Sequence, residues 1–490
     1  MAQKREPSIL LNYVYNLIYQ LVAIAFPLVV TPYISRTLQA ESIGAYSYCY
    51  SIATYFSIFS ILGLNLYGQL EISKCRNDDR LITTTFWGIF ISKAITSIFF
   101  IFLYFLTIYF TKENVGLYFA LSILLIANII DISWFYQGIE KFKNIAIRNL
   151  IIKLGSLIMI FMFVKGKEDV ITYALILNGA TFIANISLWI SFRSYIKRYI
   201  WNSGCLRIYI LNAIPYFIPT LASSIYTVLD KSMLGWIGES YYENGVYEQT
   251  HKIVLTAATV VSSLSAVLLP RMSFLFSQDR KEEYKKYLYK VLRAVGVISF
   301  PMVLGMISVA DNFIPVYLGE QYDKCVVLLK MFSPIVFFSG INTIIGGQCL
   351  IAKGQQKKYN IGVIIGATGN IILNLLLIPR LLSVGAVLAS VFAELLIFIM
   401  FLYFLDDIRP IKIVKLWEKS IIASLLMFLI IIFTPKVCDC SGLMLIINIA
   451  EGVVFYSFAL LLLKEELMVD FFHKFKKKVI TLRDSIKKMF

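Results

Sequence analysis

The chain has 490 residues, of which 59% are hydrophobic and 16% charged, and its mean hydropathy is +0.75. A soluble chain is about 25% charged, and no water-soluble core could enclose this share of apolar side chains. The composition excludes a soluble enzyme, a nucleic-acid-binding domain and a disordered scaffold, and it indicates an all-α protein that crosses the bilayer many times. The net charge of +16 is then a sign of basic cytoplasmic loops, not of nucleic acid binding.

Fourteen stretches are predicted membrane spans, since a span needs about 20 mainly apolar residues. They are residues 9–34, 43–68, 82–110, 116–136, 150–164, 170–192, 208–238, 246–269, 294–316, 326–351, 361–379, 385–405, 420–434 and 443–463. The fifth and thirteenth are short. The first continues past Pro27 without a small-residue cleavage site, so we interpret it as a retained span and not as a signal peptide. The stretch 271–293 and the tail from residue 464 are expected to be helical extensions.

The basic residues predict the orientation. With the N-terminus inside, the cytoplasmic segments hold 34 of the 46 Lys and Arg residues, the outer segments hold seven, and five lysines remain within spans. Because cytoplasmic loops collect Lys and Arg, both termini are expected in the cytoplasm. The tail 464–490 alternates apolar and basic residues at helical spacing, which predicts an amphipathic helix on the inner leaflet or, alternatively, a helix that docks a partner.

Short matches six spans apart indicate an internal repeat. Residues 44–46 (GAY) after the first span resemble residues 245–247 (GVY) after the seventh, and both first spans carry paired prolines. An even displacement preserves direction, so the halves are predicted to be parallel repeats with a cargo site between them. We expect an N-terminal lobe at 1–207, a C-terminal lobe at 208–405, two extra spans within 406–463, and the tail at 464–490.

Polar stripes within the spans predict a hydrated cationic chamber. An ionised side chain at the membrane centre costs at least about 2.5–3.5 kcal/mol, so each one suggests a partner, a cavity or a function. The stripes include the cations Lys93, Lys231 and Lys252, to which Arg36 is added, and the neutral residues Asn16, Gln20, Thr227 and Thr256. The alternative is that each lysine extends to the nearest interface, which we favour for Lys153 and Lys330.

The sequence leaves two roles open for two carboxylates near these cations. Asp230 and Lys231 are adjacent and about 100° apart on a helix, so each needs a separate partner. Asp230 and Asp131 are candidates for binding a coupled proton or sodium ion, or for structural ion pairs. Glu394 and the other in-span carboxylates are expected to be structural.

The sequence predicts no catalytic centre. It has two histidines and no phosphate-binding glycine-rich loop, so no metal site, cofactor or ATP hydrolysis is expected. The seven cysteines lack metal-type spacing. Cys438 and Cys440 form a pair in an outer loop that we interpret as two unpaired thiols, with a redox or metal role as the alternative.

Three segments together resemble the polysaccharide repeat-unit flippases, of the O-antigen and capsule type, in the multidrug/oligosaccharidyl-lipid/polysaccharide exporter superfamily. They are residues 27–38 (PLVVTPYISRTL), 131–140 (DISWFYQGIE) and 226–235 (YTVLDKSMLG), followed by the glycine and tyrosine of 245–247 and by Lys252. The likeness spans about 400 residues. The chain departs from the pattern at Gln39, where the family usually has glycine, so a tight turn cannot be assumed there.

The resemblance implies a two-lobed transporter of 14 helices in the bacterial plasma membrane. Such proteins move undecaprenyl-diphosphate-linked oligosaccharides from the inner to the outer leaflet by alternating access. It also implies that Arg36, Lys93, Lys231 and Lys252 hold the diphosphate or acidic sugars. A polysaccharide polymerase and glycosyltransferases are possible protein partners.

Other functions stay open. A lipid-linked peptidoglycan-precursor flippase and a multidrug exporter belong to the same superfamily, although in-span lysines oppose a chamber for cationic drugs. A membrane polysaccharide polymerase would need sizeable outer loops for its catalytic residues, and the loops here are about 5–10 residues long by the same span-length reasoning.

Overall fold

The computed structural model describes residues 9–192, 195, 206–238, 240–405, 410–434, 441–470 and 472. Every described regular element is a helix, and all fourteen predicted spans lie on helices. Ten helical stretches in this part of the chain are long and apolar enough to cross a membrane, and the first of them joins two of the predicted spans. The protein is an all-α, multi-pass membrane protein, as the composition predicted.

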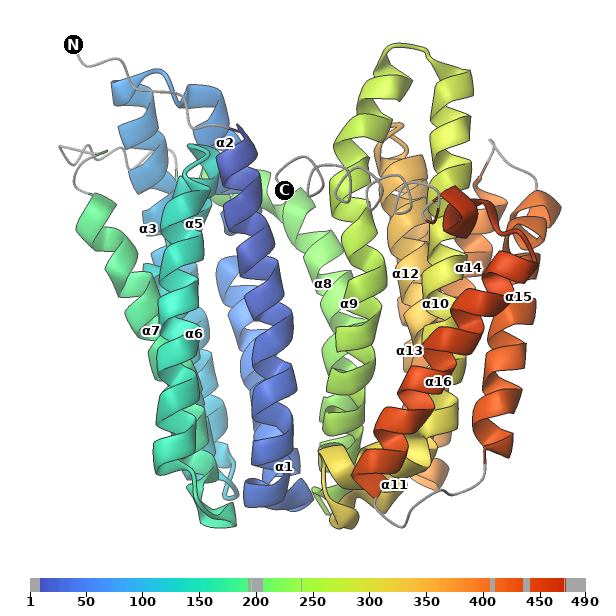
Figure 1. Cartoon of the computed structure of the whole chain (residues 1–490). Helices are drawn as coiled ribbons and strands as arrows, with labels where there is room; N and C mark the ends of the chain where they lie inside the picture. Colours follow the sequence, from blue (N-terminus) through green and yellow to red (C-terminus); the bar gives the residue numbers. More distant parts are fainter. Residues whose placement is uncertain are drawn as a thin grey trace, which may run out of the picture. The chain divides into compact units, whose positions relative to one another are not determined.

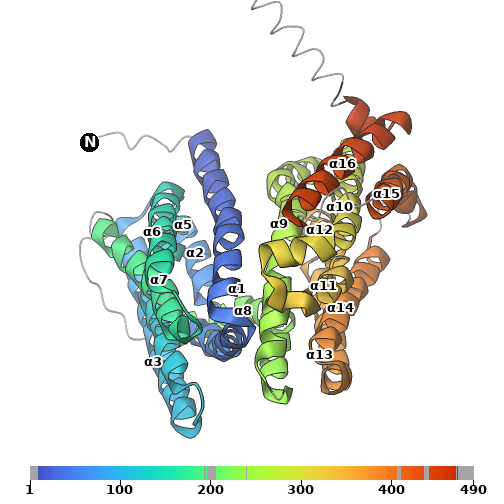
Figure 2. The same cartoon turned by 60° about the horizontal axis from the view of Figure 1, so that its bottom comes forward.

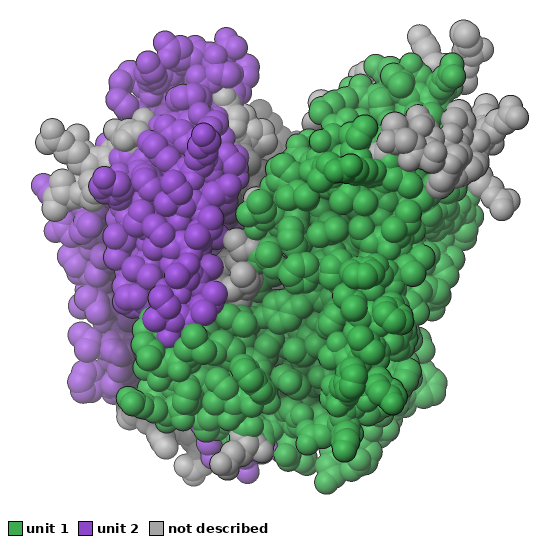
Figure 3. Space-filling view, turned by 180° about the vertical axis from the view of Figure 1, so that it is seen from behind, with its two compact units in different colours: residues 1–249, 373–386 green, residues 250–372, 387–490 purple. Residues whose placement is uncertain are grey.

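The chain forms two compact units, which Figure 3 colours separately. The first comprises residues 1–249 and 373–386, and the second comprises residues 250–372 and 387–490. This division differs in its boundaries from the predicted lobes, which remain a prediction.

Up to residue 249, the described part of the first unit contains ten helices or parts of helices (Figure 1). They are α1 (Ile9–Ile61), α2 (Leu64–Cys75), α3 (Asp79–Phe110), α4 (Val115–Ile130), α5 (Ser133–Gly138), α6 (Phe142–Phe163), the 3₁₀ turn η1 (Lys167–Asp169), α7 (Val170–Phe192), α8 (Leu206–Ile237) and the start of α9 (Tyr242–Ser277). Figures 1 and 2 both show α6 and α7 side by side.

The second unit contains the rest of α9 and the helices that follow. They are α10 (Lys281–Tyr317), the 3₁₀ turn η3 (Glu320–Tyr322), α11 (Asp323–Phe332), α12 (Ile335–Ile344), the π-helix η4 (Ile345–Ile351), α13 (Gln356–Leu381), α14 (Ser383–Tyr403), α15 (Pro410–Phe433) and α16 (Ser441–Leu462). The end of α13 and the start of α14 belong to the first unit. The predicted helical extension at 271–293 is confirmed by α9 and α10, which are separated by only three residues.

Local chemistry explains where several helices begin and end. The Asp78 carboxylate accepts hydrogen bonds from the backbone amides of Arg80 and Leu81, both at 2.9 Å, and so caps α3. Pro334 directly precedes α12, and the predicted single span at 326–351 is broken here into α11, α12 and η4. Proline cannot donate the backbone hydrogen bond that a continuous helix would need.

At Gln39, where the sequence alone left a tight turn open, the structure shows a break in the helix. Gln39 has φ 64° and ψ 168°, and it divides α1 into two helical parts. A turn is therefore present, although the residue is not glycine. This backbone region is populated almost only by glycine, so Gln39 holds a strained conformation.

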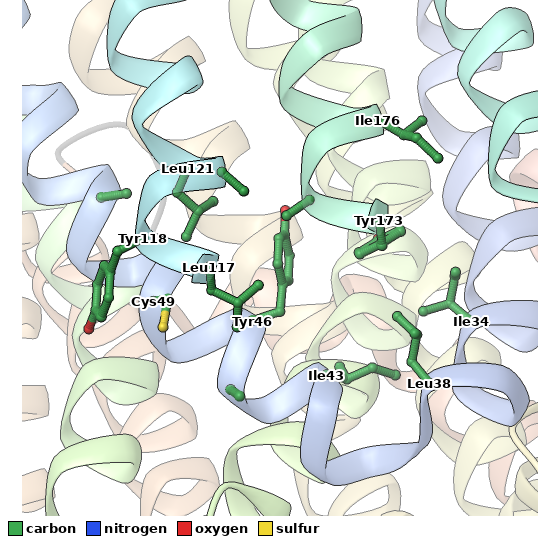
Figure 4. Close-up of a cluster of buried hydrophobic side chains, with 14 of the residues drawn as sticks. Ile34, Leu38, Ile43, Tyr46, Cys49, Leu117, Tyr118, Leu121, Tyr173 and Ile176 are labelled. Atoms are coloured by element: carbon green, nitrogen blue, oxygen red, sulfur yellow. The ribbon is translucent and has the colours of Figure 1, made fainter. Parts of the chain in front are cut away.

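Two apolar clusters form the core of the first unit. One joins α1, α3, α4, α6 and α7, and Figure 4 shows its members Leu38, Ile43 and Leu117 among the labelled side chains. The other is mainly aromatic and joins α2, α3, α5, α7 and α8, with the Phe86 ring 5.3 Å from Trp134 and 4.3 Å from Phe192. Many large apolar side chains on the outer helix faces stay exposed, which suits a surface solvated by lipid.

In the second unit, α15 packs on α10 and α16. The Trp417 indole donates to the Leu292 carbonyl at 2.7 Å, and a Cβ at Gly296 would lie 2.3 Å from the Trp417 ring. A glycine at this position therefore allows α10 and α15 to approach closely. The ion pairs that Arg293 makes with Glu465 and Glu466 join α10 to the segment after α16.

Candidate functional site

The predicted pair Asp230 and Lys231 lies at the centre of a polar network in the first unit. The Lys231 ammonium is 2.7 Å from Glu248 Oε2, and the side chains are 14% and 8% exposed. Ser47 of α1 donates to the same carboxylate oxygen at 3.1 Å. This geometry joins α1, α8 and α9 through one partly buried ion pair.

Asp230 points to different neighbours. The Tyr247 hydroxyl donates to Asp230 Oδ2 at 2.6 Å, and the Asn374 amide donates to Asp230 Oδ1 at 2.5 Å. Asp230 is fully buried. The adjacent acid and base therefore have separate partners, as their spacing on the helix predicted.

The starts of α9 and α14 are tied together by a second carboxylate. Glu243 accepts hydrogen bonds from the Ser383 hydroxyl at 2.5 Å and from the Ser383 backbone amide at 3.2 Å. Near the same end, the Asn244 amide donates to the Lys231 carbonyl at 2.7 Å. These contacts fix the beginning of α9 next to α8 and α14.

The two glycines of the predicted repeat lie against each other. A Cβ at Gly44 would be 1.8 Å from the Tyr241 carbonyl oxygen, and a Cβ at Gly245 would be 1.8 Å from the Ala40 carbonyl oxygen. Each carbonyl belongs to the residue four positions before the other glycine, so the contact is reciprocal. The structure thus gives a physical reason for glycine at both positions: two helices cross here with their backbones in contact.

Lys93 is fully buried within the first unit. Its ammonium donates to the backbone carbonyl of Asp131 at 2.5 Å and to Asn65 Oδ1 at 3.2 Å. Asp131 is the residue that ends α4. Since carbonyl groups and the helix dipole make the C-terminal end of a helix negative, this end stabilises a buried ammonium.

The Asp131 carboxylate binds a residue close to it in sequence. Its oxygens accept hydrogen bonds from the Ser133 backbone amide at 2.9 Å and from the Ser133 hydroxyl at 3.1 Å. The Asp131 carboxylate therefore holds Ser133, the first residue of the short helix α5, while the Asp131 carbonyl holds Lys93. Of the predicted site residues, Lys93 and Asp131 are brought together, whereas the neighbours Asp230 and Lys231 bind separate partners.

The other predicted residues are placed individually. Arg36 lies exposed on α1, three residues before the turn at Gln39. Lys252 and Thr256 are half-buried on the part of α9 that belongs to the second unit, and the Thr256 hydroxyl donates to the Lys252 carbonyl at 2.7 Å. The side chains of Asn16, Gln20 and Thr227, and the residues Cys438, Cys440 and 473–490, lie outside what the structure describes.

The two lysines that we predicted to extend to the interfaces have these contacts. Lys330 pairs with Asp311 at 2.7 Å, and these side chains are 36% and 65% exposed. The Lys153 ammonium lies 5.8 Å from the centre of the Phe26 ring. In the second unit, Glu394 is buried and accepts a hydrogen bond from the Asn342 amide at 2.7 Å.

Sequence reasoning missed Glu248, Tyr247 and Asn374 as members of the network. Tyr247 belongs to the predicted repeat and to the family resemblance but was not assigned to the site, and Glu248 directly follows it. A carboxylate in the first turns of a span could have drawn attention to Glu248. Asn374 is 144 residues from Asp230 in sequence, and nothing in the pattern of one chain indicates that pairing.

The chain is similar in sequence to two protein families and to individual proteins of known name. The profile of the family described as "Polysaccharide biosynthesis protein" matches residues 9–276, and that of "Lipid II flippase MurJ" matches residues 241–459. A protein of Escherichia coli K12, named as a candidate O-antigen transporter, is 24% identical over 404 residues, which cover 81% of this chain and 96% of the relative. The capsular polysaccharide biosynthesis protein CapF of Staphylococcus aureus is 24% identical over 285 residues, which cover 55% and 68%.

Solved structures agree on the fold. An inward closed structure of the lipid II flippase MurJ has a TM-score of 0.72 at 15% identity and covers 94% of this chain and all of that one. An inward-facing multidrug transporter of the MATE family has a TM-score of 0.60 at 13% identity, with 82% and 96% covered. The helical arrangement and the family profile, which matches more than half of the sequence, support one assignment: this chain belongs to the polysaccharide biosynthesis protein family.

Proposed function

We propose that the protein is a flippase that moves undecaprenyl-diphosphate-linked oligosaccharide repeat units from the inner to the outer leaflet of the bacterial plasma membrane by alternating access. The observation that carries this proposal is the family match over residues 9–276, in a chain whose membrane helices carry lysines within their spans. The names of the E. coli and S. aureus relatives point to the same class of cargo.

The chemistry of the site residues suits a diphosphate. Ammonium and guanidinium groups form short, charge-assisted hydrogen bonds with phosphate oxygens. Lys231 already contacts one anionic group, Glu248, and keeps 14% of its side chain exposed. In the proposed mechanism the cargo diphosphate competes with Glu248 for this ammonium, while Arg36, Lys93 and Lys252 supply further positive charge along the path.

The conformation described here constrains the role of Lys93. Its ammonium is enclosed by two neutral carbonyl oxygens, so it can reach the cargo only if the helices around it separate. Lys93 is therefore assigned to a step in which the end of α4 moves, whereas Arg36 is exposed and can meet the cargo without such a motion.

The test is deletion of the gene, followed by location of the lipid-linked repeat units. Accumulation on the inner face of the membrane is the expected result, and re-expression of the wild-type chain should restore export. Normal exposure of unpolymerised units on the outer face would instead indicate a polymerase and overturn the proposal. A matched Lys231→Gln variant should restore less export than Lys330→Gln, whose ion pair is exposed.

A second candidate function is a flippase for lipid-linked peptidoglycan precursors. The match of residues 241–459 to the lipid II flippase profile favours it. The same deletion distinguishes the two functions by the sugar that accumulates, because a peptidoglycan-precursor flippase would cause build-up of the cell-wall precursor and arrest growth. Loss of a surface polysaccharide with continued growth supports the first candidate.

We further propose Asp230 as the residue that couples transport to a proton or sodium ion. Its carboxylate is buried and accepts hydrogen bonds from the neutral donors Tyr247 and Asn374, and a buried carboxylate responds to a nearby cation. Transport into proteoliposomes should depend on an imposed proton or sodium gradient in the wild type and lose that dependence in Asp230→Asn. Equal gradient dependence in both proteins would remove Asp230 from the coupling step.

A further inference from the structure

A pocket of about 420 Å³ opens in the first unit, where the α3–α4 connection meets the end of α8. Its size falls within the range of about 300–1,000 Å³ typical of small-molecule sites. Five of its lining residues are aromatic, among them Tyr48, Trp236 and Tyr241, and Lys112, Glu113 and Asn114 supply polar groups. None of the residues discussed above as cargo or coupling groups lines it.

The aromatic wall is built by close helix packing. The Tyr48 and Tyr241 rings lie 5.8 Å apart with an angle of 35° between their planes. Gly235 of α8 makes room for the Tyr48 ring, because a Cβ there would lie 2.2 Å from it. The indole of the neighbouring residue Trp236 is 78% exposed and lies at the pocket.

Hydrogen-bonding groups converge on the same space. The Tyr241 hydroxyl donates to Glu113 Oε2 at 3.2 Å and accepts from the Asn114 amide at 3.0 Å. Burial, followed by the nearby Glu113 carboxylate, raises the pKa of Tyr241 to about 12, so its hydroxyl keeps its proton at neutral pH. The pocket thus offers a carboxylate acceptor and an amide beside aromatic faces.

An aromatic belt at the membrane surface would account for an exposed tryptophan alone. It does not account for a pocket in which a carboxylate, an amide and a phenol are linked by hydrogen bonds. A pyranose ring presents C–H groups on its faces and hydroxyl groups around its edge. Flat aromatic side chains can pack against the C–H groups, and a few fixed acceptors and donors can bind the hydroxyl groups.

We infer that this pocket binds an uncharged sugar ring. Trp236 and Tyr48 pack against the C–H face of the ring, and Glu113 and Asn114 bind its hydroxyl groups. Lys112 and Glu113 bring one positive and one negative charge to the lining, so the pocket has no net charge with which to favour a uronic acid or a phosphate. The inference rests on the proposed function in naming the source of the sugar, which is the oligosaccharide part of the cargo.

The predicted topology gives the pocket a place in transport. Both connections that form it follow odd-numbered predicted spans, the third and the seventh, and so belong to the outer side. A sugar site at this position would hold the head of the cargo as it leaves. The glycosyl end of the repeat unit is then bound separately from the diphosphate, which the in-span cations receive.

The experiment uses the full chain in lipid nanodiscs and saturation-transfer NMR with three soluble probes: methyl α-glucopyranoside, methyl N-acetylglucosaminide and glycerol 3-phosphate. The wild type should transfer saturation to at least one of the two sugars and not to the phosphate. Trp236→Ala and the near-isosteric Glu113→Gln should each lower the signal roughly fivefold, the effect of losing one aromatic or charged contact. Phe433→Ala, an aromatic 79% exposed elsewhere, and Glu320→Gln, an exposed carboxylate in the η3 turn, are the matched controls and should retain it.

Each outcome decides the inference. Absence of transfer to both sugars, or equal signals in wild type and the two pocket variants, overturns it. Transfer to glycerol 3-phosphate in place of the sugars makes the pocket a lipid-headgroup site and overturns it as well. A sugar signal that depends on Trp236 and Glu113, in a protein whose deletion leaves export normal, supports the sugar site and refutes the proposed function. If deletion blocks export but the wild type gives no sugar signal that depends on Trp236 and Glu113, only the sugar site is refuted.

Discussion

Individual side chains in this protein show how a membrane helix can carry a charge. Lys93 is fully buried, and it is stabilised by the carbonyl end of α4 without a salt bridge among its hydrogen bonds. Lys231 is stabilised by Glu248. The two lysines were predicted from the same pattern of in-span charge, yet the first depends on a helix terminus and the second on an ion pair.

The Lys231–Glu248 pair leads to a prediction for stability. Lys231→Met should lower the free energy of unfolding by about 3 kcal/mol, because it leaves the largely buried Glu248 without its counter-ion. Lys330→Met breaks a pair of which the acid is 65% exposed, and it should cost less than about 1 kcal/mol. Thermal unfolding of both variants in the same detergent makes the comparison, and equal losses would contradict it.

A double variant separates structure from transport at the same position. Lys231→Met with Glu248→Gln removes both charges and should regain most of the stability lost by Lys231→Met alone, since no buried charge is left unpaired. Export of polysaccharide should stay low, because the ammonium proposed to meet the diphosphate is still missing. Full export by the double variant would show that Lys231 serves only the fold.

At Gln39 we predict a substitution that raises the stability of the protein. Its φ of 64° and ψ of 168° cost about 1–3 kcal/mol for a residue with a Cβ, and glycine adopts them without this strain. Gln39→Gly should therefore raise the thermal stability, with a net gain of about 1 kcal/mol after the added freedom of the unfolded chain. Gly155→Ala, at an open position on α6, is a control for the general effect of exchanging glycine and a residue with a side chain. A loss of stability in Gln39→Gly would show that the Gln39 side chain contributes more than the strain costs.

At the scale of the helices, the crossing of α1 and α9 depends on two glycines. An added Cβ at Gly44 or Gly245 would lie 1.8 Å from a backbone oxygen, and no side-chain rotation can relieve that contact. Gly44→Ala should destabilise the protein by about 1–3 kcal/mol, the range for overpacking, and Gly245→Ala should do the same. Gly155→Ala meets nothing within 4 Å and should be neutral or slightly stabilising. Similar unfolding temperatures for Gly44→Ala and Gly155→Ala would mean that the crossing is not formed.

The elements also show the limit of what the sequence predicts. Apolar runs of about 20 residues identified the long helices that the structure describes, because lipid requires an uninterrupted hydrogen-bonded backbone. Breaks inside those runs were not predicted: the span at 326–351 is divided at Pro334, that at 116–136 at Asp131 and Ile132, and that at 43–68 at Leu62 and Gly63. These breaks are short, and apolar residues on either side conceal them from a hydropathy pattern.

For the site residues, too, the sequence predicts the position in a helix but not the contacts. Periodicity places Lys93, Asp230 and Lys231 on polar faces of their helices, but it cannot name their partners. Glu248 and Asn374 come from other helices, and the contact of Asn374 with Asp230 closes a loop of 144 residues. Pairing over such distances is set by tertiary packing, which a single sequence does not display.

At the scale of the whole molecule, the distribution of charge predicts how the chain lies in the membrane. The described α9–α10 connection contains Asp279 and is flanked by many of the 34 basic residues assigned to the cytoplasm, whereas the α3–α4 connection contains Glu113 and a single lysine. Basic segments are retained inside during insertion, so these two connections should lie on opposite sides.

Single cysteines in a chain without its seven native cysteines test this orientation. In intact spheroplasts, Glu113→Cys should react with a membrane-impermeant maleimide, and Asp279→Cys should react only after the membrane is opened. Glu113 and Asp279 both lie in short, exposed connections, so a difference in labelling reports the side of the membrane and not the burial of the thiol. Labelling of Asp279→Cys in intact spheroplasts would invert the topology. The pocket at Glu113 would then face the cytoplasm, and its proposed sugar would be bound on entry instead of release.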